Sequence, residues 1–421
     1  MTTAPPGSST APRLHDVLSG QHGAEALGRI AVDPLGNGAR DPLTERLPLD
    51  RVVSVELMRT KYKPGRKLTG YYRVHDRTSE PARPIAVTWY PDERVGVLVS
   101  PEDAALPQLA RLSDRARLAP LLGHVSGRSP GHASELVVQP VRYRPGQRHV
   151  LHVVGGRLGP DGVYAKVDRD DSGARAVPVA TELGAHFVAS CPGARLVQPV
   201  GYAAAERVAV WEGTPGVPLW HRLRDGRAEG IRLIYLVGRA LRVLHEADAR
   251  VGRTHSVPAE TAATLRAGEH LTALLPREGD RYRHLVSAVV ETLDRWPVEP
   301  ATLVHGDVKC DNLLAVGDRQ VTFLDLDRVA LAEPALDLGK FLADLRWWCP
   351  AARLRGLCRA LRAGYGACDP ARWARADLLA VLFSAKLAAR RCEVHDPAWT
   401  SQVETRLSGA SDALEVARAA R

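Results

Sequence analysis

The sequence predicts a two-lobed α+β fold, in which a small lobe of antiparallel strands precedes a large helical lobe. Short alternating strands dominate as far as about residue 219, and two similar Pro-Gly turns interrupt them, in KYKPGRK at 61–67 and RYRPGQR at 142–148. Beyond residue 219, long segments with helical spacing take over. Such an arrangement leaves a cleft between the lobes, which is where a ligand site is expected.

The first half of the chain contains two related units in tandem. Strands of the first unit cover Val52 to Val74 and the segment RPIAVTWYPD, and a helix is predicted at 102–122. Strands of the second unit cover Val137 to Val154 and the segment GVYAKVD, and a helix is predicted at 174–190. The strands LVVQPVRY and RLVQPVGY close the two units, so we expect a duplication that shares the strand around Gln139.

The second half is predicted to be mainly helical, with short strands in its middle. Helices are expected at 230–247, 259–275, 281–295, 336–348, 351–365, 371–392 and 400–420, and strands at 302–305, 312–315 and 321–326. The domains expected are a flexible leader (1–50), an N-terminal cap that is a degenerate copy of the small lobe (51–135), a nucleotide-binding lobe (136–213) and a helical lobe (214–421).

Composition narrows the class of protein. Charged residues make up 25% and hydrophobic residues 45%, as in an ordinary globular protein, and we expect neither a membrane span nor a signal peptide. The six cysteines form no CxxC pair, which favours reduced thiols and a cytoplasmic location. The net charge is +9, but the cations are interspersed with acids, so an anionic ligand such as a nucleotide explains the excess better than a nucleic acid does.

The choice of cation is unusual and points to particular positions. The chain has seven lysines against fifty arginines, so most positions that need only a positive charge carry arginine. A compact ammonium and a planar guanidinium serve different purposes, and each retained lysine is therefore a candidate functional residue. The lysines are Lys61, Lys63, Lys67, Lys166, Lys309, Lys340 and Lys386.

Candidate catalytic residues lie in the segment 303–342, LVHGDVKCDNLLAVGDRQVTFLDLDRVALAEPALDLGKFL. Asp307 and Asn312 follow an apolar strand, and Asp325 comes at the end of VTFLD. Phosphoryl transfer from a metal-bound nucleotide needs one carboxylate to accept a hydroxyl proton, and an amide with a second carboxylate to hold Mg²⁺. The pattern therefore indicates a phosphotransferase.

The same segment resembles the aminoglycoside phosphotransferase family of small-molecule kinases, which have a protein-kinase-like fold. Its HxDxxxxN motif is matched by His305, Asp307 and Asn312, its hydrophobic-Asp-x-Asp motif by Asp325 and Asp327, and its PxxDLA helix start by PALDLGKFL. The resemblance covers roughly residues 137–420 and implies ATP and Mg²⁺ as cofactors. It implies that Asp307 is the catalytic base, that Asn312, Asp325 and Asp327 form the metal site, and that Asp337 supports the catalytic loop.

Further nucleotide-site residues follow from the resemblance. A strand lysine, Lys166, is expected to meet the α- and β-phosphates and to pair with Glu182 of the next helix. The phosphates are expected to face the turn that contains Gly146 and Arg148. Lys309 stands where protein kinases place a lysine for the γ-phosphate. The adenine is expected at the backbone of a hinge formed by Val210, Trp211, Glu212 and Gly213.

The first unit lacks the corresponding lysine, because Trp89 is expected at the position of Lys166 and an indole cannot pair with a phosphate. We therefore expect this unit to be a cap or a dimer surface, and the second unit to bind the nucleotide.

Three functions remain open at this stage. The first is ATP-dependent phosphorylation of a hydroxyl on an aminoglycoside-like small molecule, for which Glu393, Asp396 and Glu404 are candidate acids in the acceptor site. The second is a sugar kinase, because maltokinase-like enzymes also resemble this chain in having an N-terminal cap. The third is a pseudokinase that binds nucleotide without turnover, against which the intact Lys166, Asp307 and Asn312 argue.

Overall fold

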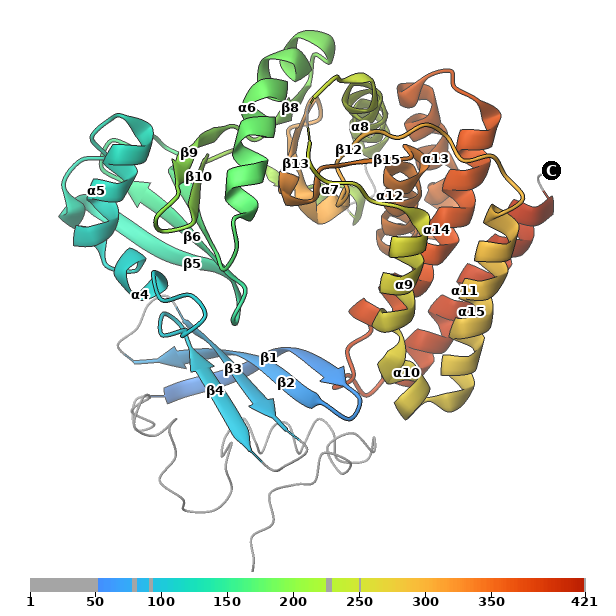
Figure 1. Ribbon diagram of the computed structural model, residues 1–421, viewed down its shortest axis with the longest axis horizontal. Coiled ribbons are helices and arrows are strands. Elements are labelled where there is room, and N and C mark those ends of the chain that lie inside the picture. Colours follow the sequence, from blue (N-terminus) through green and yellow to red (C-terminus); the bar gives the residue numbers. More distant parts are fainter. Residues whose placement is uncertain (1–51, 78–81, 91–93, 225–228, 250, 420–421) are drawn as a thin grey trace, which may run out of the picture.

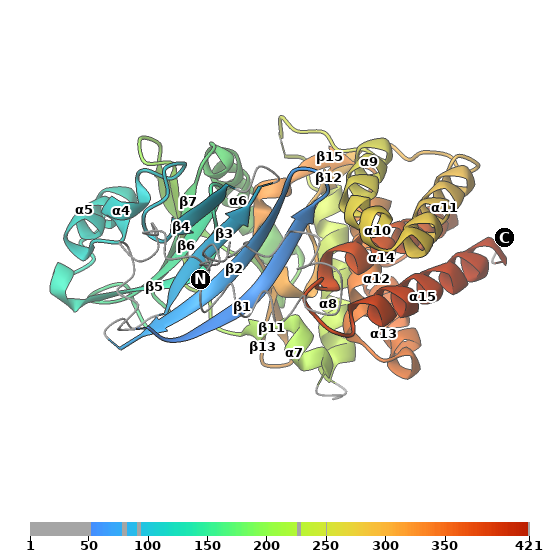
Figure 2. The ribbon, with the colours of Figure 1, turned by 90° about the horizontal axis from the view of Figure 1, so that it is seen from below.

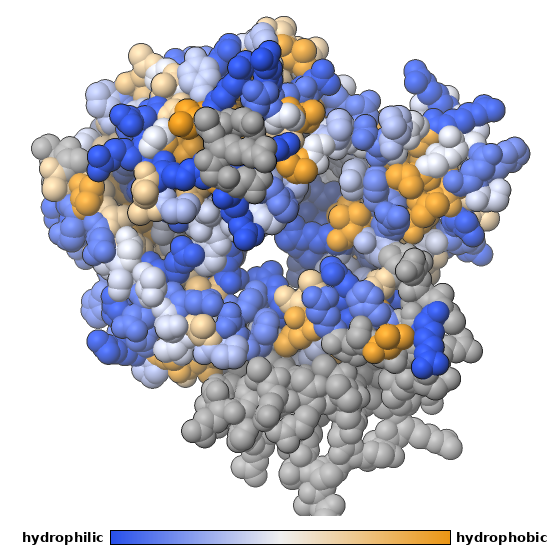
Figure 3. Space-filling view, turned by 180° about the vertical axis from the view of Figure 1, so that it is seen from behind, coloured by the Kyte–Doolittle hydropathy of each residue, from blue (hydrophilic) through white to orange (hydrophobic). Residues whose placement is uncertain are grey.

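The computed structural model describes residues 52–77, 82–90, 94–224, 229–249 and 251–419, so the predicted leader at 1–50 lies outside the described residues. Figure 1 shows three bodies: a sheet below, a second sheet with its helices on the left, and a helical lobe on the right. The space-filling view in Figure 3 shows a central opening between them. The predicted α+β architecture with an antiparallel lobe before a helical lobe is confirmed.

The first sheet, called the cap sheet below, consists of four consecutive antiparallel strands in the order β1-β2-β3-β4. They are β1 (Val52–Lys63), β2 (Lys67–Asp76), β3 (Arg83–Trp89) and β4 (Val95–Val99), of which β4 was not predicted. The Pro-Gly turn of KYKPGRK joins β1 to β2, and Gly65 there takes the left-handed conformation with a φ of 64°. A small core with Tyr72, Ile85 and Val87 lies on one face.

The second sheet has the order β5-β6-β7-β10-β9 and carries the second Pro-Gly hairpin. Its strands are β5 (Leu136–Arg144), β6 (Arg148–Gly155), β7 (Val163–Asp168), β9 (Pro199–Ala203) and β10 (Val208–Glu212). The helices beside it are α4 (Leu109–Leu112), α5 (Arg115–Ser126) and α6 (Ser172–Ser190), and a 3-10 turn, η2 (Ala133–Glu135), precedes β5.

The helix predicted at 102–122 is two helices. Asp114 separates them because its backbone is extended and its side chain accepts a hydrogen bond from the N–H of Ala116, which caps α5. Leu106, Leu109 and Leu118 pack into the same apolar cluster as the strands of the second sheet. The predicted domain boundary at 135 therefore falls inside one core, and the division between the two cores lies before Leu106.

The two units are less alike than the sequence suggested. The strand around Gln139 is not shared, because β5 pairs only in the second sheet and β4 stands beside β3 in the first. The ladders also correct the position equivalent to Lys166. In the second sheet, β6 begins at Arg148, and Lys166 pairs with the residue two positions later, Val150. In the cap sheet, β2 begins at Lys67, and the residue two positions later pairs with Thr88 rather than with Trp89. Threonine, like tryptophan, brings no cation to this position.

The helical lobe contains the helices α7 (Leu219–Arg224), α8 (Glu229–Glu246), α9 (Val257–Ala267), α10 (Glu269–Leu274), α11 (Pro276–Leu293), α12 (Ala335–Trp348), α13 (Ala351–Tyr365), α14 (Pro370–Arg391) and α15 (Trp399–Ala419). The helix predicted at 259–275 is broken at Gly268, where a Cβ would lie 2.3 Å from the ring of Tyr282. Within the described ranges, no helix is long and apolar enough to cross a bilayer. The six cysteines are free.

Two small sheets connect this lobe to the rest of the chain. One has the order β11-β13-β14-β8, from β8 (Ala194–Leu196), β11 (Val217–Pro218), β13 (Leu313–Val316) and β14 (Gln320–Phe323). The other pairs β12 (Thr302–Val304) with β15 (Ala330–Ala332). These short strands hold the two loops that carry the candidate catalytic residues.

The cap sheet reaches the helical lobe directly. Figure 2 shows β1 and β2 crossing the underside of the molecule toward α10 and α14. The N–H of Thr60 donates to Glu393, at 3.0 Å, and the Thr60 hydroxyl lies 3.2 Å from His395 Nδ1. Arg59 pairs with Glu393 and donates to the carbonyl of Arg390. The cap sheet is therefore a third wall around the central opening.

Candidate active site

The catalytic loop runs from the end of β12 to a 3-10 turn, η3 (Cys310–Asn312). Gly306 in this loop has a φ of 72°, and a Cβ there would lie 2.2 Å from the carbonyl oxygen of Arg328. Only glycine fits, which gives the HGD sequence a structural reason. His305 donates from Nε2 to the carbonyl of Leu324 at 3.0 Å and accepts from the N–H of Asp307 at its other nitrogen. The imidazole thus ties the loop to the end of β14.

Helix α12 holds this loop with three side chains spaced by helical turns. Asp337 accepts the N–H groups of His305, at 2.6 Å, and Gly306, at 2.9 Å. Lys340, one turn further on, donates to the carbonyl of Gly306 at 2.9 Å. Asp344, two turns from Asp337, accepts the N–H of Cys310 at 2.6 Å. The structural position expected for Asp337 is confirmed, and Lys340 and Asp344 complete the clamp.

Asp337 is a fully buried carboxylate that stays charged. Burial by itself would raise its pKa, but the hydrogen bond and charge of His245 and the N–H of His305 outweigh it and lower the pKa. A charged acceptor binds backbone N–H groups more strongly than a neutral one does. The loop is therefore fixed by a charge that the fold itself keeps ionised.

Asp307 stands at the centre of the loop with both carboxylate oxygens engaged. Its Oδ1 lies 2.6 Å from Lys340, and its Oδ2 lies 3.0 Å from Lys309. The side-chain amide of Asn312 donates to the carbonyl of Asp307 at 2.9 Å. Although burial disfavours its charge, Lys340 and Lys309 hold the pKa of Asp307 well below its usual range. The carboxylate is thus ionised and able to accept a hydrogen bond from a hydroxyl group.

The second loop brings two more carboxylates to the same place. Asp325 follows β14 in the left-handed conformation, with a φ of 62°, and Asp327 lies in the turn η4 (Leu326–Arg328). Lys166 of β7 contacts both carboxylates, at 2.8 Å for Asp325. Arg148 of β6 also contacts Asp327 and lies 3.7 Å from Asp325. These four side chains thus join the second sheet to the helical lobe.

The oxygens left free in this cluster are of the kind that Mg²⁺ prefers. Oδ1 of Asp327 is buried and has no hydrogen-bond partner. The amide nitrogen of Asn312 is used by Asp307, which leaves its oxygen available. Burial, with the charge of Asp325, raises the pKa of Asp327, although Lys166 and Arg148 oppose this shift. Asn312, Asp325 and Asp327 therefore fit a magnesium ion.

The predicted pair of Lys166 and Glu182 is not formed. Lys166 is buried against Asp325 and Asp327, whereas Glu182 lies on the exposed face of α6 and, among the residues that the structure describes, has no ion-pair partner. The spacing along the chain was compatible with a pair, but the rotation of α6 turns its buried face, with Val179 and Leu183, toward the core instead. Lys166 is at the site and Glu182 is not.

The phosphate-facing turn and the hinge have their N–H groups already bonded within the protein. The N–H of Gly146 donates to Asp103 at 2.6 Å, and Tyr143 donates to the same carboxylate at 2.9 Å. In the hinge, Glu212 donates its N–H to the carbonyl of Gln198, and Gly213 donates to that of Gly162.

Val210 and Trp211 of the hinge are buried strand residues of β10, paired with β7 and β9 on either side. The N–H groups of Gly146, Glu212 and Gly213 are therefore engaged within the protein in this conformation.

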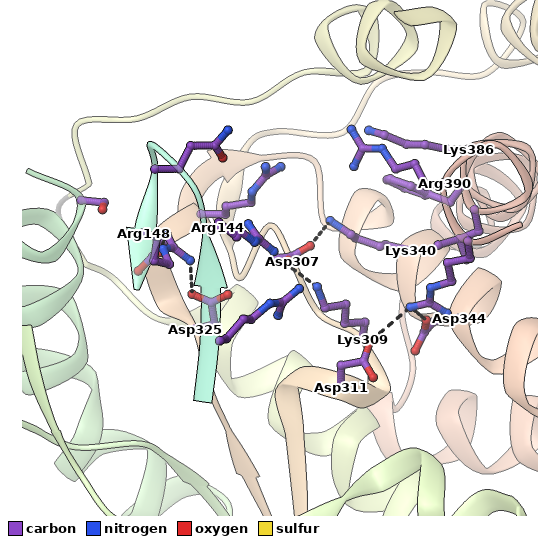
Figure 4. Close-up of a pocket in the computed structure, with 18 of the residues that line it drawn as sticks. Arg144, Arg148, Asp307, Lys309, Asp311, Asp325, Lys340, Asp344, Lys386 and Arg390 are labelled. Atoms are coloured by element: carbon purple, nitrogen blue, oxygen red, sulfur yellow. Dashed lines mark hydrogen bonds and ion pairs between the residues drawn. The ribbon is translucent and has the colours of Figure 1, made fainter. Parts of the chain in front are cut away.

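The loops face a cavity of about 1050 Å³. Figure 4 shows Asp307 between Arg144 on one side and Lys340 on the other, with Lys386 and Arg390 of α14 further along the same side as Lys340. In Figure 3 the central opening is bordered by hydrophilic side chains. Asp325, Asp327 and Arg148 line the cavity together with Arg59 of the cap sheet. Of the predicted site residues, Arg148, Asp307, Lys309, Asp325 and Asp327 line this cavity. Lys166 and Asn312 contact these carboxylates, whereas Gly146 and Glu182 do not line the cavity.

Several lining residues were missed by reasoning from the sequence. Lys340 and Asp344 stood at helical spacing from Asp337, and Lys340 was one of the few retained lysines, so a signal existed. Arg59 carried no signal, because it is far from the catalytic loop along the chain and only the packing of the cap sheet brings it to the cavity.

Comparison with known proteins agrees with this geometry. The model of the phosphotransferase enzyme family matches residues 164–379, which is 216 of the 421 residues. An amicoumacin kinase in complex with AMP-PNP, Ca²⁺ and Ami has a TM-score of 0.50 and 12% identity, with 71% of this chain and 94% of that chain covered. This likeness supports the same fold.

Two further solved structures have TM-scores below 0.5. A spectinomycin phosphotransferase in complex with ADP and spectinomycin has a TM-score of 0.48 and 12% identity, covering 72% of this chain and 97% of that one. A choline/ethanolamine kinase family protein from Mesorhizobium loti has a TM-score of 0.46 and 16% identity, covering 66% and 88%. No curated protein matches the sequence significantly.

Proposed function

The chain belongs to the phosphotransferase enzyme family, and from this premise we propose that it is a small-molecule kinase, which transfers the γ-phosphate of ATP to a hydroxyl group. The observation that carries the proposal is the position of Asp307. It is an ionised carboxylate on a clamped loop, and it lines one cavity together with Arg148, Asp325 and Asp327. Lys166 is paired with the last two carboxylates.

The chemistry requires few steps from the protein. Asp307 accepts the proton of the acceptor hydroxyl, whose oxygen then attacks the γ-phosphorus while the bond to the leaving ADP oxygen breaks. Lys309 lies 3.0 Å from Asp307, close enough to balance negative charge that develops beside the base. Asn312 fixes the loop through the Asp307 carbonyl. The catalytic contribution of these residues is mainly position and charge, as in other phosphoryl transfers.

Lys166 and Arg148 are the cations placed to meet the phosphates. In the structure they neutralise Asp325 and Asp327. Asn312, Asp325 and Asp327 would hold Mg²⁺, which would supply positive charge next to the phosphates. The two cations are then free to contact phosphate, because the carboxylates have another partner. Within the described ranges, no group of three or more His, Cys, Asp or Glu side chains forms a separate metal site.

The test separates nucleotide binding from transfer. Binding is measured as the rise in melting temperature with Mg²⁺ and AMP-PNP, and transfer as ADP release with pooled hydroxyl compounds (sugars, aminoglycosides and hydroxy acids). We expect Asp307→Asn to keep binding but to lose about 10²- to 10⁴-fold in transfer, the usual contribution of a general base. Asp325→Asn is expected to weaken Mg²⁺-dependent binding. The exposed Asp412→Asn is the control.

Two results would refute the proposal. One is the absence of any Mg²⁺-dependent nucleotide binding by the wild-type protein. The other is transfer by Asp307→Asn within threefold of the wild type, because the carboxylate would then not be the base.

A further inference from the structure

We propose that the acceptor carries a negatively charged group, a carboxylate or a phosphate, which binds to three arginines beside Asp307. These are Arg144 of β5, Arg328 after Asp327, and Arg390 of α14, and we call them the arginine neck. The inference rests on the proposed kinase activity and names the class of acceptor. It differs from the aminoglycoside-like acceptor that the family resemblance implied.

The arginine neck stands between two cavities. Besides the cavity at Asp307, a second cavity of about 790 Å³ lies between the cap sheet, the β5–β6 hairpin and the helices α9, α10 and α14. The three arginines line both cavities, and so do Arg59, Arg142 and Glu393. A molecule that enters between the cap sheet and the helical lobe therefore passes the neck before it reaches Asp307.

The outer cavity is strongly basic. Of the described residues that line it, ten are lysines or arginines and two are acids, Glu269 and Glu393. Glu393 is already paired with Arg59 and accepts the N–H of Thr60, so its charge is largely used by the cap contact. A charged cavity wall of one sign attracts ligands of the opposite sign and repels those of the same sign. The surface thus favours anions over polycations.

The neck arginines have no acid of their own. Within the described part of the chain, Arg144, Arg328 and Arg390 have neither an ion pair nor a side-chain hydrogen bond, whereas Lys309, Lys340 and Lys386 are each paired with an acid. Desolvation, together with Arg142 and Arg148, lowers the pKa of Arg144 to about 10, although the charges of Asp325 and Asp307 oppose this shift. Desolvation and the nearby Arg328 lower that of Arg390. Gathering guanidinium groups without an acid paired to them is unfavourable, and a bound anion would reduce this cost.

Their arrangement suits an acceptor with an anionic end and a hydroxyl end. Arg144 shares a face of β5 with Arg142, and Arg390 shares a face of α14 with Phe383 and Leu387, which also line the inner cavity. Figure 4 shows Arg144 and Arg390 on opposite sides of Asp307. A guanidinium offers two parallel donors to a carboxylate or phosphate. The anionic end would sit between the arginines and leave the hydroxyl at Asp307.

The acids expected for an aminoglycoside are not in place. Of Glu393, Asp396 and Glu404, only Glu393 lines either cavity. Asp396 accepts hydrogen bonds from Ala398 and Gln402 in its own loop, and Glu404 lies on the exposed face of α15.

The experiment uses probes of one skeleton and different charge. Binding of D-glucose, D-glucosamine, D-gluconate and D-glucose 6-phosphate to the full chain, saturated with Mg²⁺ and AMP-PNP, is measured by NMR, and ATP turnover is measured with each. We expect the two anions to bind at least tenfold more tightly than the neutral and cationic probes. Comparing gluconate with the phosphate ester shows which anion the neck prefers.

Variants locate the effect. Arg144→Gln and Arg390→Gln are each expected to weaken binding of the preferred anion about 10- to 100-fold, the value of a lost charge-assisted hydrogen bond, with unchanged affinity for AMP-PNP. Arg359→Gln, on the exposed face of α13, is the matched control and should change neither.

The outcomes separate this inference from the kinase activity. Turnover with glucose or glucosamine that equals or exceeds that with the anions would overturn the inference while upholding the kinase. Equal binding of all four probes would overturn it as well. A loss of AMP-PNP affinity in Arg144→Gln and Arg390→Gln as large as the loss for the anion would assign the neck to the nucleotide and refute the inference.

Discussion

Asp337→Ala should destabilise the protein, and the size of the loss can be worked out from the hydrogen bonds that Asp337 accepts. Asp337 is 1% exposed and accepts the N–H groups of His305 and Gly306 at 2.6 and 2.9 Å. Its removal leaves two buried donors without a partner, and each costs about 1–3 kcal/mol. The lowered pKa of Asp337 shows that its partners outweigh its desolvation, so little is regained by removing the charge. We expect a loss of about 2–6 kcal/mol in the free energy of unfolding.

Urea unfolding followed by circular dichroism measures this loss. Asp337→Asn keeps one accepting oxygen and should fall between Asp337→Ala and the wild type. Asp412→Ala, an exposed change on α15, should stay within about 0.5 kcal/mol of the wild type. Phosphoryl transfer should fall together with stability in Asp337→Ala, because the loop that carries Asp307 loses its anchor. A loss below about 1 kcal/mol would refute the reasoning, since buried N–H groups would then have found other partners.

Two further predictions concern charged pairs. Lys166→Met should weaken Mg²⁺-dependent AMP-PNP binding, measured by calorimetry, about 10- to 100-fold. The exposed Glu182→Gln should leave this binding unchanged. A similar loss in both variants would support the pairing of Lys166 with Glu182 that the sequence suggested. The pKa of Glu260 is lowered from 4.5 to about 2, because the hydrogen bond from His255 and the charge of Lys386 outweigh burial. Because the pKa of Glu260 is lower in the folded state than in the unfolded state, the ionised carboxylate stabilises the fold above about pH 4.5. About 3 kcal/mol of the free energy of unfolding is lost as the pH falls toward 2. Glu260→Gln should lack this part of the pH dependence in urea unfolding, and an unchanged slope between pH 5 and 2 would contradict it.

The residues nearest the chemistry were predictable because local sequence determines them. Gly306, with its φ of 72°, and Asp325, with its φ of 62°, adopt conformations imposed by tight loops, and the side chains within each loop keep a fixed spacing. Asp307 and Asn312 lie five residues apart in one loop and are joined by a hydrogen bond. Positions along α12 were predictable in the same way, because i, i+3 and i+7 share one helix face.

The pairing of Lys166 could not be predicted in the same way. Its position on β7 was correctly predicted, but its partners are 159 and 161 residues away. The choice between Glu182 and the two aspartates depends on how α6 is rotated against the sheet, and chain spacing does not contain that angle. The equivalence of Trp89 and Lys166 failed for a related reason, because strand register is set by the pairing on both sides of a hairpin and a one-residue slip changes it.

By itself, the sequence determined the order of strands and helices, the two loops that carry the acidic residues, and the type of reaction they suit. Periodicity, turn residues and short-range spacing act within a few residues, and they are readable without the fold. Only the tertiary structure decided what surrounds Asp307. Arg59, Arg144, Arg328 and Arg390 come from four distant segments, and they meet because the cap sheet folds against the end of α14. Charge at a cavity depends on which side chains converge there, and that convergence is a property of packing rather than of neighbouring residues.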